Sequence, residues 1–330
     1  MGRRTMRGAV LLAVVLATVV GWGPSPVLAG DTEYHYRPFE ITLFPPIQIF
    51  QAPNKVVVGP SINVLYGRAT AVYGIEVGGV LNIERERFAG VQAAPINLVG
   101  GPFYGIQGGV VNVVGRLYGI QAAPLWNSVR EGGIGLQGSA FINLAGDDFG
   151  GLQLGTANLA SGDLSGLQLS WTFNGAGGDV GGVQLALGNA VGGDLSGLQV
   201  GPILNWVVRD VSGVQLGMVN IAGKVPTALG SLSKARSNPN PSDRSEVRGL
   251  QIALITNITA SVQGIQVGPG NVTETVTGLQ LGLVNQAGRV NGLQIGAMNF
   301  CTVLNGVQIG GINVATDNFI PFMLGLNVGW

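Results

Sequence analysis

The stretch Gly278–Ala315 reads GLQLGLVNQAGRVN, GLQIGAMNFCTVLN and GVQIGGINVA, which are three copies of one phrase at a spacing of 14 residues. Each copy has glycine, an aliphatic residue, glutamine, a second aliphatic residue, a small residue, two variable positions and asparagine. Because self-similarity at a short, fixed period is the signature of a repeat architecture, this phrase is the unit from which the fold must be explained.

The phrase begins at 15 glycines, and glutamine follows two residues later in 14 copies, with Glu76 in the first. Thirteen of the fourteen spacings are 14 to 16 residues. Val56–Asn63 resembles Leu198–Asn205 and is interpreted as a degenerate earlier copy. The starting glycines are Gly74, Gly90, Gly105, Gly119, Gly135, Gly151, Gly166, Gly182, Gly197, Gly213, Gly249, Gly264, Gly278, Gly292 and Gly306.

The rest of the chain divides into a leader, a lead-in and one insertion. Residues 1–29 combine a basic start, a short apolar run and small residues before a cleavage site, which predicts a secretory signal peptide. Residues 30–54 are an aromatic-rich lead-in, with short strands expected at Ile41–Phe44 and Ile47–Phe50. Residues 55–330 are expected to form a single β-repeat domain, interrupted by a polar surface loop at about 224–247.

The composition excludes several classes of protein. Without Arg3, Arg4 and Arg7 the expected mature chain has 14 basic against 17 acidic groups, which argues against electrostatic binding of nucleic acid. The single histidine, His35, and the single cysteine, Cys301, cannot assemble a zinc site, a disulfide or a Cys–His nucleophile. An apolar, charge-poor exported chain without spanning helices is either a soluble repeat-built β structure or a β-barrel.

Alternation within each copy predicts strands. Leu279 and Leu281 alternate with Gly278, Gln280 and Gly282, which is the period of two expected for a half-buried strand. The glycine content disfavours helix, at about 1 kcal/mol per residue relative to alanine. Charged residues fall between the copies, at expected turns. The clusters Glu84–Arg87 and Asp147-Asp148 are therefore interpreted as solvated turns rather than as acid–base pairs.

One all-β architecture that fits is an antiparallel outer-membrane-type β-barrel with one copy per strand. A repeat of 14 to 16 residues leaves the roughly 9–11 residues that a membrane-crossing strand needs. In Phe322–Trp330, Phe322, Leu324, Leu326, Val328 and Trp330 share one face, as in the terminal strand of outer-membrane barrels. Aliphatic side chains would then face lipid and glutamines would face the lumen.

The alternative is a β-solenoid in which each copy is one coil. Here Leu279 and Leu281 are expected to point inward, with Gln280 and Asn285 stacked on their equivalents as ladders. The glycine-to-asparagine distance is seven residues in some copies and eight in others, which a corner absorbs more easily than a continuous strand. Proline also recurs five residues after the glycine, as at Pro202, although a closed barrel has no edge strand to accept it.

The order of these distances makes the barrel the leading expectation. From Gly135 to Gly213 they alternate strictly between eight and seven, so that pairs of copies form the unit. A hairpin has two unlike ends and explains such pairing, whereas a uniform solenoid does not. The prolines are then expected to mark bulges.

The tandem phrases GLQLGLVNQA, GLQIGAMNF and GVQIGGINVA resemble the exported surface-repeat proteins of Gram-negative bacteria. The resemblance runs from about Val56 to Trp330 and implies an outer-membrane or cell-surface location with no assigned enzymatic activity. It departs from the neatest repeats before Gly135, where Ala-Ala-Pro replaces the aliphatic–small pair.

The sequence offers no catalytic, cofactor-binding or metal-ligating residues, so that no enzyme is expected and no cofactor is implied. The leading function is a structural or weakly pore-forming outer-membrane protein with the lipid bilayer as its partner. The alternative is a soluble or surface-attached β-solenoid module that presents glutamine and asparagine ladders to a surface glycan or a protein ligand.

Overall fold

The structure is a computed structural model that describes residues 33–52, 54–223 and 245–330. The chain divides into two compact units, Met1–Trp171 and Thr172–Trp330, and the boundary falls inside strand β14 (Leu164–Ala176). Every regular secondary-structure element in the described residues is a β-strand. The predicted signal peptide at residues 1–29 and nearly all of the predicted loop at 224–247 lie outside the described residues.

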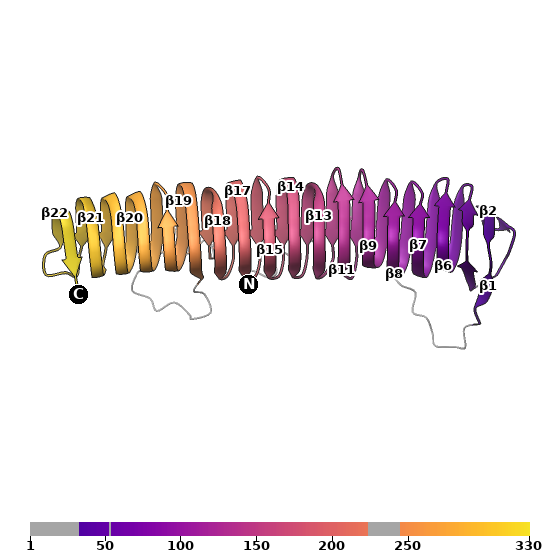
Figure 1. Cartoon of the computed structure of the whole chain (residues 1–330), viewed down its shortest axis with the longest axis horizontal. Helices are drawn as coiled ribbons and strands as arrows, with labels where there is room; N and C mark the ends of the chain where they lie inside the picture. The colour runs from indigo at the N-terminus through magenta and orange to yellow at the C-terminus, as the bar shows by residue number, and fades with distance from the viewer. Residues whose placement is uncertain (1–32, 53, 224–244) are drawn as a thin grey trace. The chain divides into compact units, whose positions relative to one another are not determined.

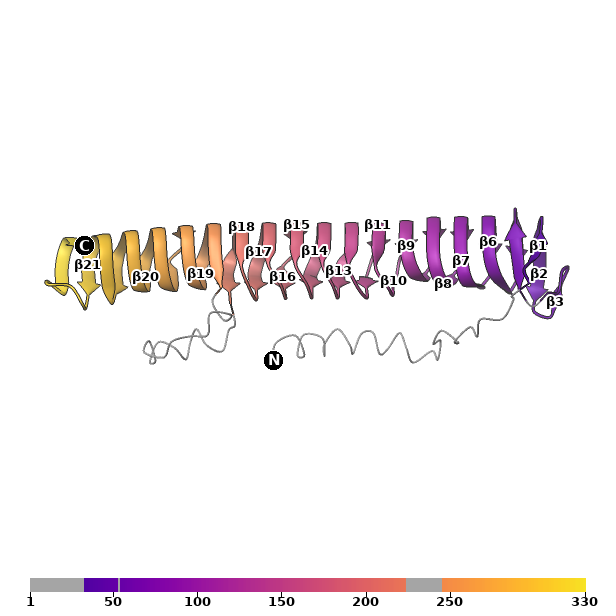
Figure 2. The ribbon, with the colours of Figure 1, turned by 90° about the horizontal axis from the view of Figure 1, so that it is seen from below.

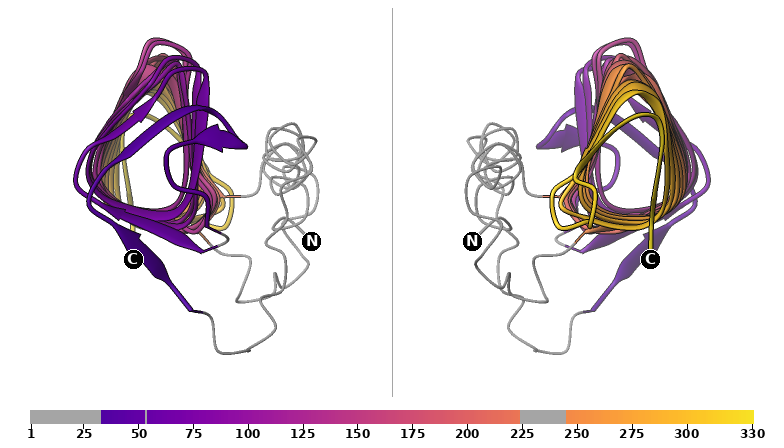
Figure 3. Two further views of the ribbon diagram at one scale, coloured as in Figure 1. Left: turned by 90° about the vertical axis from the view of Figure 1, so that its right-hand side faces the viewer. Right: turned by 90° about the vertical axis from the view of Figure 1, so that its left-hand side faces the viewer.

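Unit 1 is a β-solenoid in which successive turns of the chain stack in parallel (Figure 1). Equivalent residues of the phrase lie side by side, with Gly90 beside Gly105 and Gln92 beside Gln107. Seen end-on, the turns enclose a roughly triangular outline (Figure 3, left). The repeat strands that lie wholly in unit 1 are β4 (Lys55–Val58), β5 (Ser61–Asn63), β6 (Tyr66–Gly78), β7 (Leu81–Ala93), β8 (Ile96–Gly108), β9 (Val111–Ala123), β10 (Trp126–Val129), β11 (Gly133–Ser139), β12 (Ile142–Ala145) and β13 (Phe149–Ala160).

The lead-in forms the first strands of unit 1. The two predicted short strands are confirmed as β2 (Glu40–Phe44) and β3 (Ile47–Gln48), which pair antiparallel on either side of Pro45-Pro46. They follow β1 (His35–Arg37), which pairs in parallel with β4. The predicted earlier copy at Val56–Asn63 does stack on the repeats, because β4 and β5 both pair in parallel with β6.

Unit 2 is also a β-solenoid, and its stacked turns are seen from a second side in Figure 2. The last strand of unit 2 pairs antiparallel with the strand before it. The aliphatic face of the last strand is exposed, as the alternation of its sequence predicts. Its strands after β14 are β15 (Val180–Leu185), β16 (Gly188–Val191), β17 (Leu195–Val207), β18 (Val211–Ala222), β19 (Glu246–Val267), β20 (Gly270–Cys301), β21 (Val303–Ala315) and β22 (Phe322–Gly329).

The leading expectation of an antiparallel outer-membrane-type barrel is wrong. In both units the repeat strands pair in parallel and in register, as in β17 with β18 and β7 with β8. A two-residue alternation has the same appearance in parallel and antiparallel strands, so that it did not separate the two architectures. The alternative β-solenoid is the fold of each unit.

The seven- and eight-residue distances are absorbed at a corner of each turn. Between β17 and β18 the register is kept up to Gly201 beside Gly217 and resumes at Leu204 beside Val219, so that the longer copy has one more residue at the corner. Pro202 lies at this corner, where the ladder needs no N–H donor. The alternation of distances therefore reflects unequal corners, and the expectations of hairpin pairs and of prolines marking barrel bulges are wrong.

The interior of each turn contains two columns of buried amides. Along the glutamine column Nε2 donates to the Oε1 of the glutamine one turn earlier, as in Gln280 to Gln266 at 2.9 Å. Along the asparagine column Nδ2 donates in the opposite direction, as in Asn285 to Asn299 at 2.8 Å. A second asparagine hydrogen bond reaches a backbone carbonyl, as in Asn285 to Ile295 at 2.9 Å. The ladders expected for a solenoid are thus confirmed, and the opposed donor directions let the two sets of amide dipoles offset each other.

Apolar side chains fill the rest of the interior. The residue two positions before the starting glycine points inward, and Phe88 stacks on Phe103 with ring centroids 5.2 Å apart. The residue two positions after the asparagine also points inward and is usually small. In unit 2 the two positions together form a core of Val276, Ala287, Val290, Cys301, Leu304 and Ala315.

The starting glycines form a column, and all of them except Gly135 have positive φ angles. Gly105 has a φ of 132°, and a Cβ at this position would lie 1.9 Å from the carbonyl oxygen of Gly90 in the turn before. Both the backbone conformation and the close approach of neighbouring turns therefore require glycine.

We expect Gly105→Ala to destabilise the chain by at least about 2 kcal/mol, because it combines an unfavourable φ angle with a backbone clash. Gly108→Ala in the same strand is the matched control, because a Cβ there meets no atom within 4 Å. Urea unfolding of both variants measures the difference, and equal stabilities would contradict the role of the glycine column.

The buried amides yield a second comparison within one strand. Gln266→Leu leaves the Gln251 Oε1 and the Gln280 Nε2 without their partners, which are 2.8 and 2.9 Å away in the native chain. We expect a loss of at least about 2 kcal/mol in the free energy of unfolding, at about 1–3 kcal/mol for each buried unpaired group.

Gln263→Leu is the control, because Gln263 lies three residues earlier in the same strand and is exposed. We expect its unfolding free energy to stay within about 0.5 kcal/mol of the native value. A Gln266→Leu variant as stable as Gln263→Leu would show that the amide column does not stabilise the solenoid.

Candidate functional site

The aliphatic residues on either side of each glutamine point outward. Because Gln280 points inward, its neighbours Leu279 and Leu281 face the exterior, opposite to the orientation expected for a solenoid. Leu281 is 40% exposed. The exposed members of these rows include Ile75, Val91, Ile106 and Ile120 in unit 1, and Ile265, Leu281 and Ile309 in unit 2.

A second outward row lies at the corner before each asparagine. Its most exposed members in unit 2 include Leu254 at 74% and Leu283 at 63%. Equivalent exposed residues are Val80, Val110, Leu125 and Phe141 in unit 1, and Leu187, Ile203 and Met218 in unit 2. The corner row adjoins the flanking aliphatics, so that each unit has a broad apolar exterior.

This apolar exterior is also free of charge. From the starting glycine to the residue after the asparagine, the only charged residue in the 15 copies is Glu76, which is buried. We call the outward side chains of these segments the charge-free face, and it is defined separately for unit 1 and for unit 2. A contiguous apolar surface of this kind marks an interaction site.

Charged residues occupy the remaining part of each turn. In unit 2, the Asp179 Oδ1 accepts the Asp194 backbone N–H at 2.9 Å, and the Asp194 Oδ1 accepts that of Asp210 at 3.0 Å. Arg209 forms ion pairs with Asp179 and Asp194. These carboxylates have structural contacts at the turns, as the sequence predicted for the charges between copies.

The alternative function assumed that glutamine and asparagine ladders are presented to a ligand, and this is wrong. Gln92, Gln107, Asn97 and Asn112 have 0–1% of their surface exposed. Their amide groups are occupied by one another across successive turns. The ladders are therefore not available to a partner.

The glutamine column of unit 1 ends on carboxylates. Gln92 donates its Nε2 to the Glu76 Oε2 at 2.9 Å and to the Glu84 Oε2 at 2.5 Å. Asn63 donates to the Glu76 Oε1 at 2.8 Å. Glu84–Arg87 lies within strand β7 and Glu84 is fully buried, so that the expectation of a turn is wrong for this cluster and the expectation of a solvated position is wrong for Glu84.

Burial first, and the neighbouring Glu76 carboxylate second, raise the pKa of Glu84 well above 4.5. The buried Glu84 Oε1 has no hydrogen-bond partner, so that no donor stabilises a negative charge on this atom. Glu84 therefore keeps its proton to a higher pH than an ordinary glutamate does.

The raised pKa predicts how stability depends on pH. In the unfolded chain Glu84 ionises near its ordinary pKa, whereas the folded chain keeps the proton, so that this residue lowers stability as the pH rises above about 4.5. Glu84→Gln keeps a neutral side chain at every pH. We expect it to be more stable than the native chain at about pH 8 and similar near about pH 4.

Thermal unfolding across this pH range measures the effect. Glu86→Gln is the control, because Glu86 is exposed on the same strand and undergoes the same substitution. A native chain whose stability falls with pH only as steeply as that of Glu84→Gln would contradict a raised pKa of Glu84.

The single histidine and the single cysteine belong to different units. His35 lies on β1, whereas Cys301 is buried in the apolar core of unit 2, where burial raises its pKa to about 12. No group of three or more His, Cys, Asp or Glu side chains in the described part of the chain could hold a metal ion. Among residues 33–52, 54–223 and 245–330, no helix is long and apolar enough to span a membrane.

The chain was compared with protein-family profiles, with curated proteins and with solved structures, and none of them matches it.

Proposed function

We propose that this chain is a non-enzymatic, exported β-solenoid binding module that attaches to the outer membrane or cell surface by laying its charge-free face on lipid. The observation that supports this most is the confinement of charge. Fifteen successive copies keep charged residues out of the same outward segment, although charges occur freely in the rest of the turns. Export rests on the sequence of residues 1–29, and a surface location also on the resemblance to surface-repeat proteins.

The backbone of the solenoid suits contact with lipid. Interior turns pair on both sides, as β8 does with β7 and β9, so that their peptide groups are hydrogen-bonded within the fold. An apolar environment penalises unpaired peptide groups, and a flat parallel sheet with satisfied neighbours avoids that penalty. The outward side chains are mostly aliphatic and offer few donors or acceptors for a glycan, which favours lipid over a sugar ligand.

Binding to lipid through the charge-free face should depend little on salt. The mature chain, beginning at Gly30, is expected to float with vesicles of zwitterionic phosphatidylcholine, and the bound fraction is expected to change little between low and high salt. Apolar contact is only weakly sensitive to ionic strength, whereas attraction between exposed charges is screened.

The double substitution Leu254→Asp and Leu283→Asp should weaken partition into the vesicles by at least about tenfold, because each leucine contributes up to about 1.5–3 kcal/mol on full burial. Thr302→Asp and Thr316→Asp form the matched control. These threonines are exposed at equivalent positions of two neighbouring turns, outside the charge-free face, and the double change adds the same charge.

A native chain that stays with the soluble fraction would overturn the proposal, as would equal losses in the two double variants. Sedimentation velocity without lipid tests the main competitor, a second copy of the chain on the same face. Self-association that Leu254→Asp and Leu283→Asp abolish, without any flotation, would replace lipid by another copy as the partner.

A further inference from the structure

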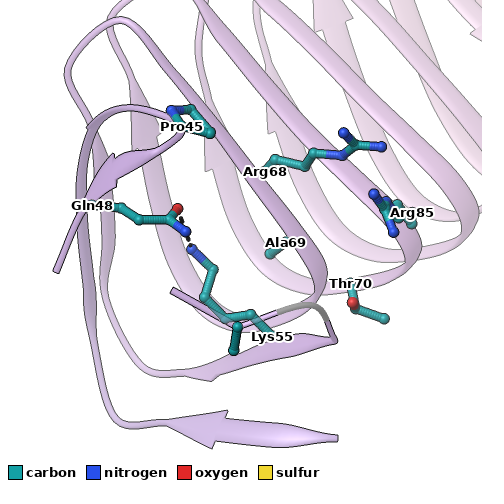
Figure 4. A pocket seen from close by; sticks show the side chains of 8 residues that line it. Pro45, Gln48, Lys55, Arg68, Ala69, Thr70 and Arg85 are labelled. Atoms are coloured by element: carbon teal, nitrogen blue, oxygen red, sulfur yellow. Dashed lines mark hydrogen bonds between the residues drawn. The ribbon is translucent and has the colours of Figure 1, made fainter. Parts of the chain in front are cut away.

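A cavity of about 170 Å³ lies in unit 1 between the lead-in and the first repeat turns. Its lining comes from the β2–β3 connection, from β3 and the residues after it, from β4 and from the neighbouring strands β6 and β7. Figure 4 shows its labelled side chains, which include Pro45, Gln48, Lys55, Arg68, Thr70 and Arg85. The volume is more than ten times the minimum of about 10–15 Å³ that holds one water, so that a polyatomic ligand fits.

The wall formed by β4 contributes a buried cation. Lys55 is 3% exposed, and its Nζ donates to the Gln48 Oε1 at 3.0 Å and lies 3.2 Å from the Glu40 Oε1. Burial lowers the pKa of Lys55, and the Glu40 carboxylate partly offsets this effect. Glu40 therefore neutralises Lys55 without removing its remaining capacity to donate.

The wall formed by β6 and β7 contributes two arginines from successive turns. Arg68 and Arg85 have exposed side chains, and neither has a hydrogen bond or ion pair with a described residue. Partial burial first, and the Arg68 guanidinium second, lower the pKa of Arg85. The Glu86 carboxylate opposes this shift but accepts a hydrogen bond from the Tyr34 hydroxyl at 3.0 Å. The cavity thus has two positive charges without an acidic partner in contact.

We propose that this cavity binds a tetrahedral oxyanion, a phosphate or sulfate group, between Arg68 and Arg85. Guanidinium groups donate two parallel hydrogen bonds to such oxygens, and two neighbouring guanidiniums supply more donors than a single one. A planar carboxylate has only two oxygens and satisfies fewer of them. The site is independent of the charge-free face and would exist without lipid.

Calorimetric titration of the native mature chain with inorganic phosphate, without lipid, tests the site. We expect saturable binding of phosphate and of sulfate, and much weaker binding of acetate. Arg68→Gln with Arg85→Gln should weaken phosphate binding at least tenfold. Arg68→Lys with Arg85→Lys should give an intermediate affinity, because the charge remains but the paired donors are lost.

Arg116→Gln is the matched control. Arg116 is an exposed arginine of the same unit, paired with Glu131 at 3.6 Å, and its substitution should leave phosphate binding unchanged. Unfolding of each variant without phosphate checks that the fold is intact. Bound phosphate should raise the unfolding temperature of the native chain and of Arg116→Gln, but not that of the double glutamine variant.

Flotation with two kinds of vesicle distinguishes a lipid phosphate from a free anion as the source of the oxyanion. Tighter flotation with phosphatidic acid than with phosphatidylcholine, lost in the double glutamine variant, identifies a lipid phosphate. Binding of inorganic phosphate without such a gain identifies a free anion. Failure of phosphate and sulfate to bind, an equal loss in Arg116→Gln, or acetate bound as tightly as phosphate overturns the site, whether or not the chain floats with phosphatidylcholine.

Discussion

The buried amide columns decide the orientation of every strand. A glutamine enclosed in the solenoid must find a partner, and its partner is the same residue one turn away. A slip of one residue would place a leucine in the column and turn the amide outward, which leaves neighbouring amides unpaired at a cost of about 1–3 kcal/mol each. The aliphatic side chains are on the surface because the amides hold the interior, and this is the origin of the charge-free face.

Much of the local structure follows from the sequence alone. The period-two alternation identifies the strands, and the strands around Pro45-Pro46 appear where expected. The polar stretches between copies are turns at Asp147-Asp148, but Glu84–Arg87 lies within β7. The pairing direction did not follow, since alternation is shared by parallel and antiparallel strands. The evidence against a barrel was nevertheless present in the sequence. Proline at Pro95 and Pro202 and the variable distance to the asparagine both suit a corner, and the structure places corners there.

The positions of the ionisable groups are harder to predict from the sequence than the strands are. Glu84 follows Asn82 by two residues, as Val99 follows Asn97, so that comparison of the copies would have placed it in the apolar column. Its neighbours in the ERER cluster concealed this, because adjacent residues of a strand face opposite sides. The cavity could not be found in this way. Lys55, Arg68 and Arg85 share no motif, and only the path of the lead-in places Lys55 in the lining of the same cavity as the two arginines.

The reversed last strand limits how far the stack can grow. Parallel turns with identical sequences expose an edge that templates further copies, as in amyloid fibres. In unit 2 that edge is covered by β22, which runs in the opposite direction, and its Asn327 donates to the Gln308 Oε1 at 3.2 Å. An incoming copy of the phrase would meet a strand of the wrong polarity and an amide acceptor already in use. In unit 2, β22 therefore shields the edge of β21 from parallel pairing with another chain.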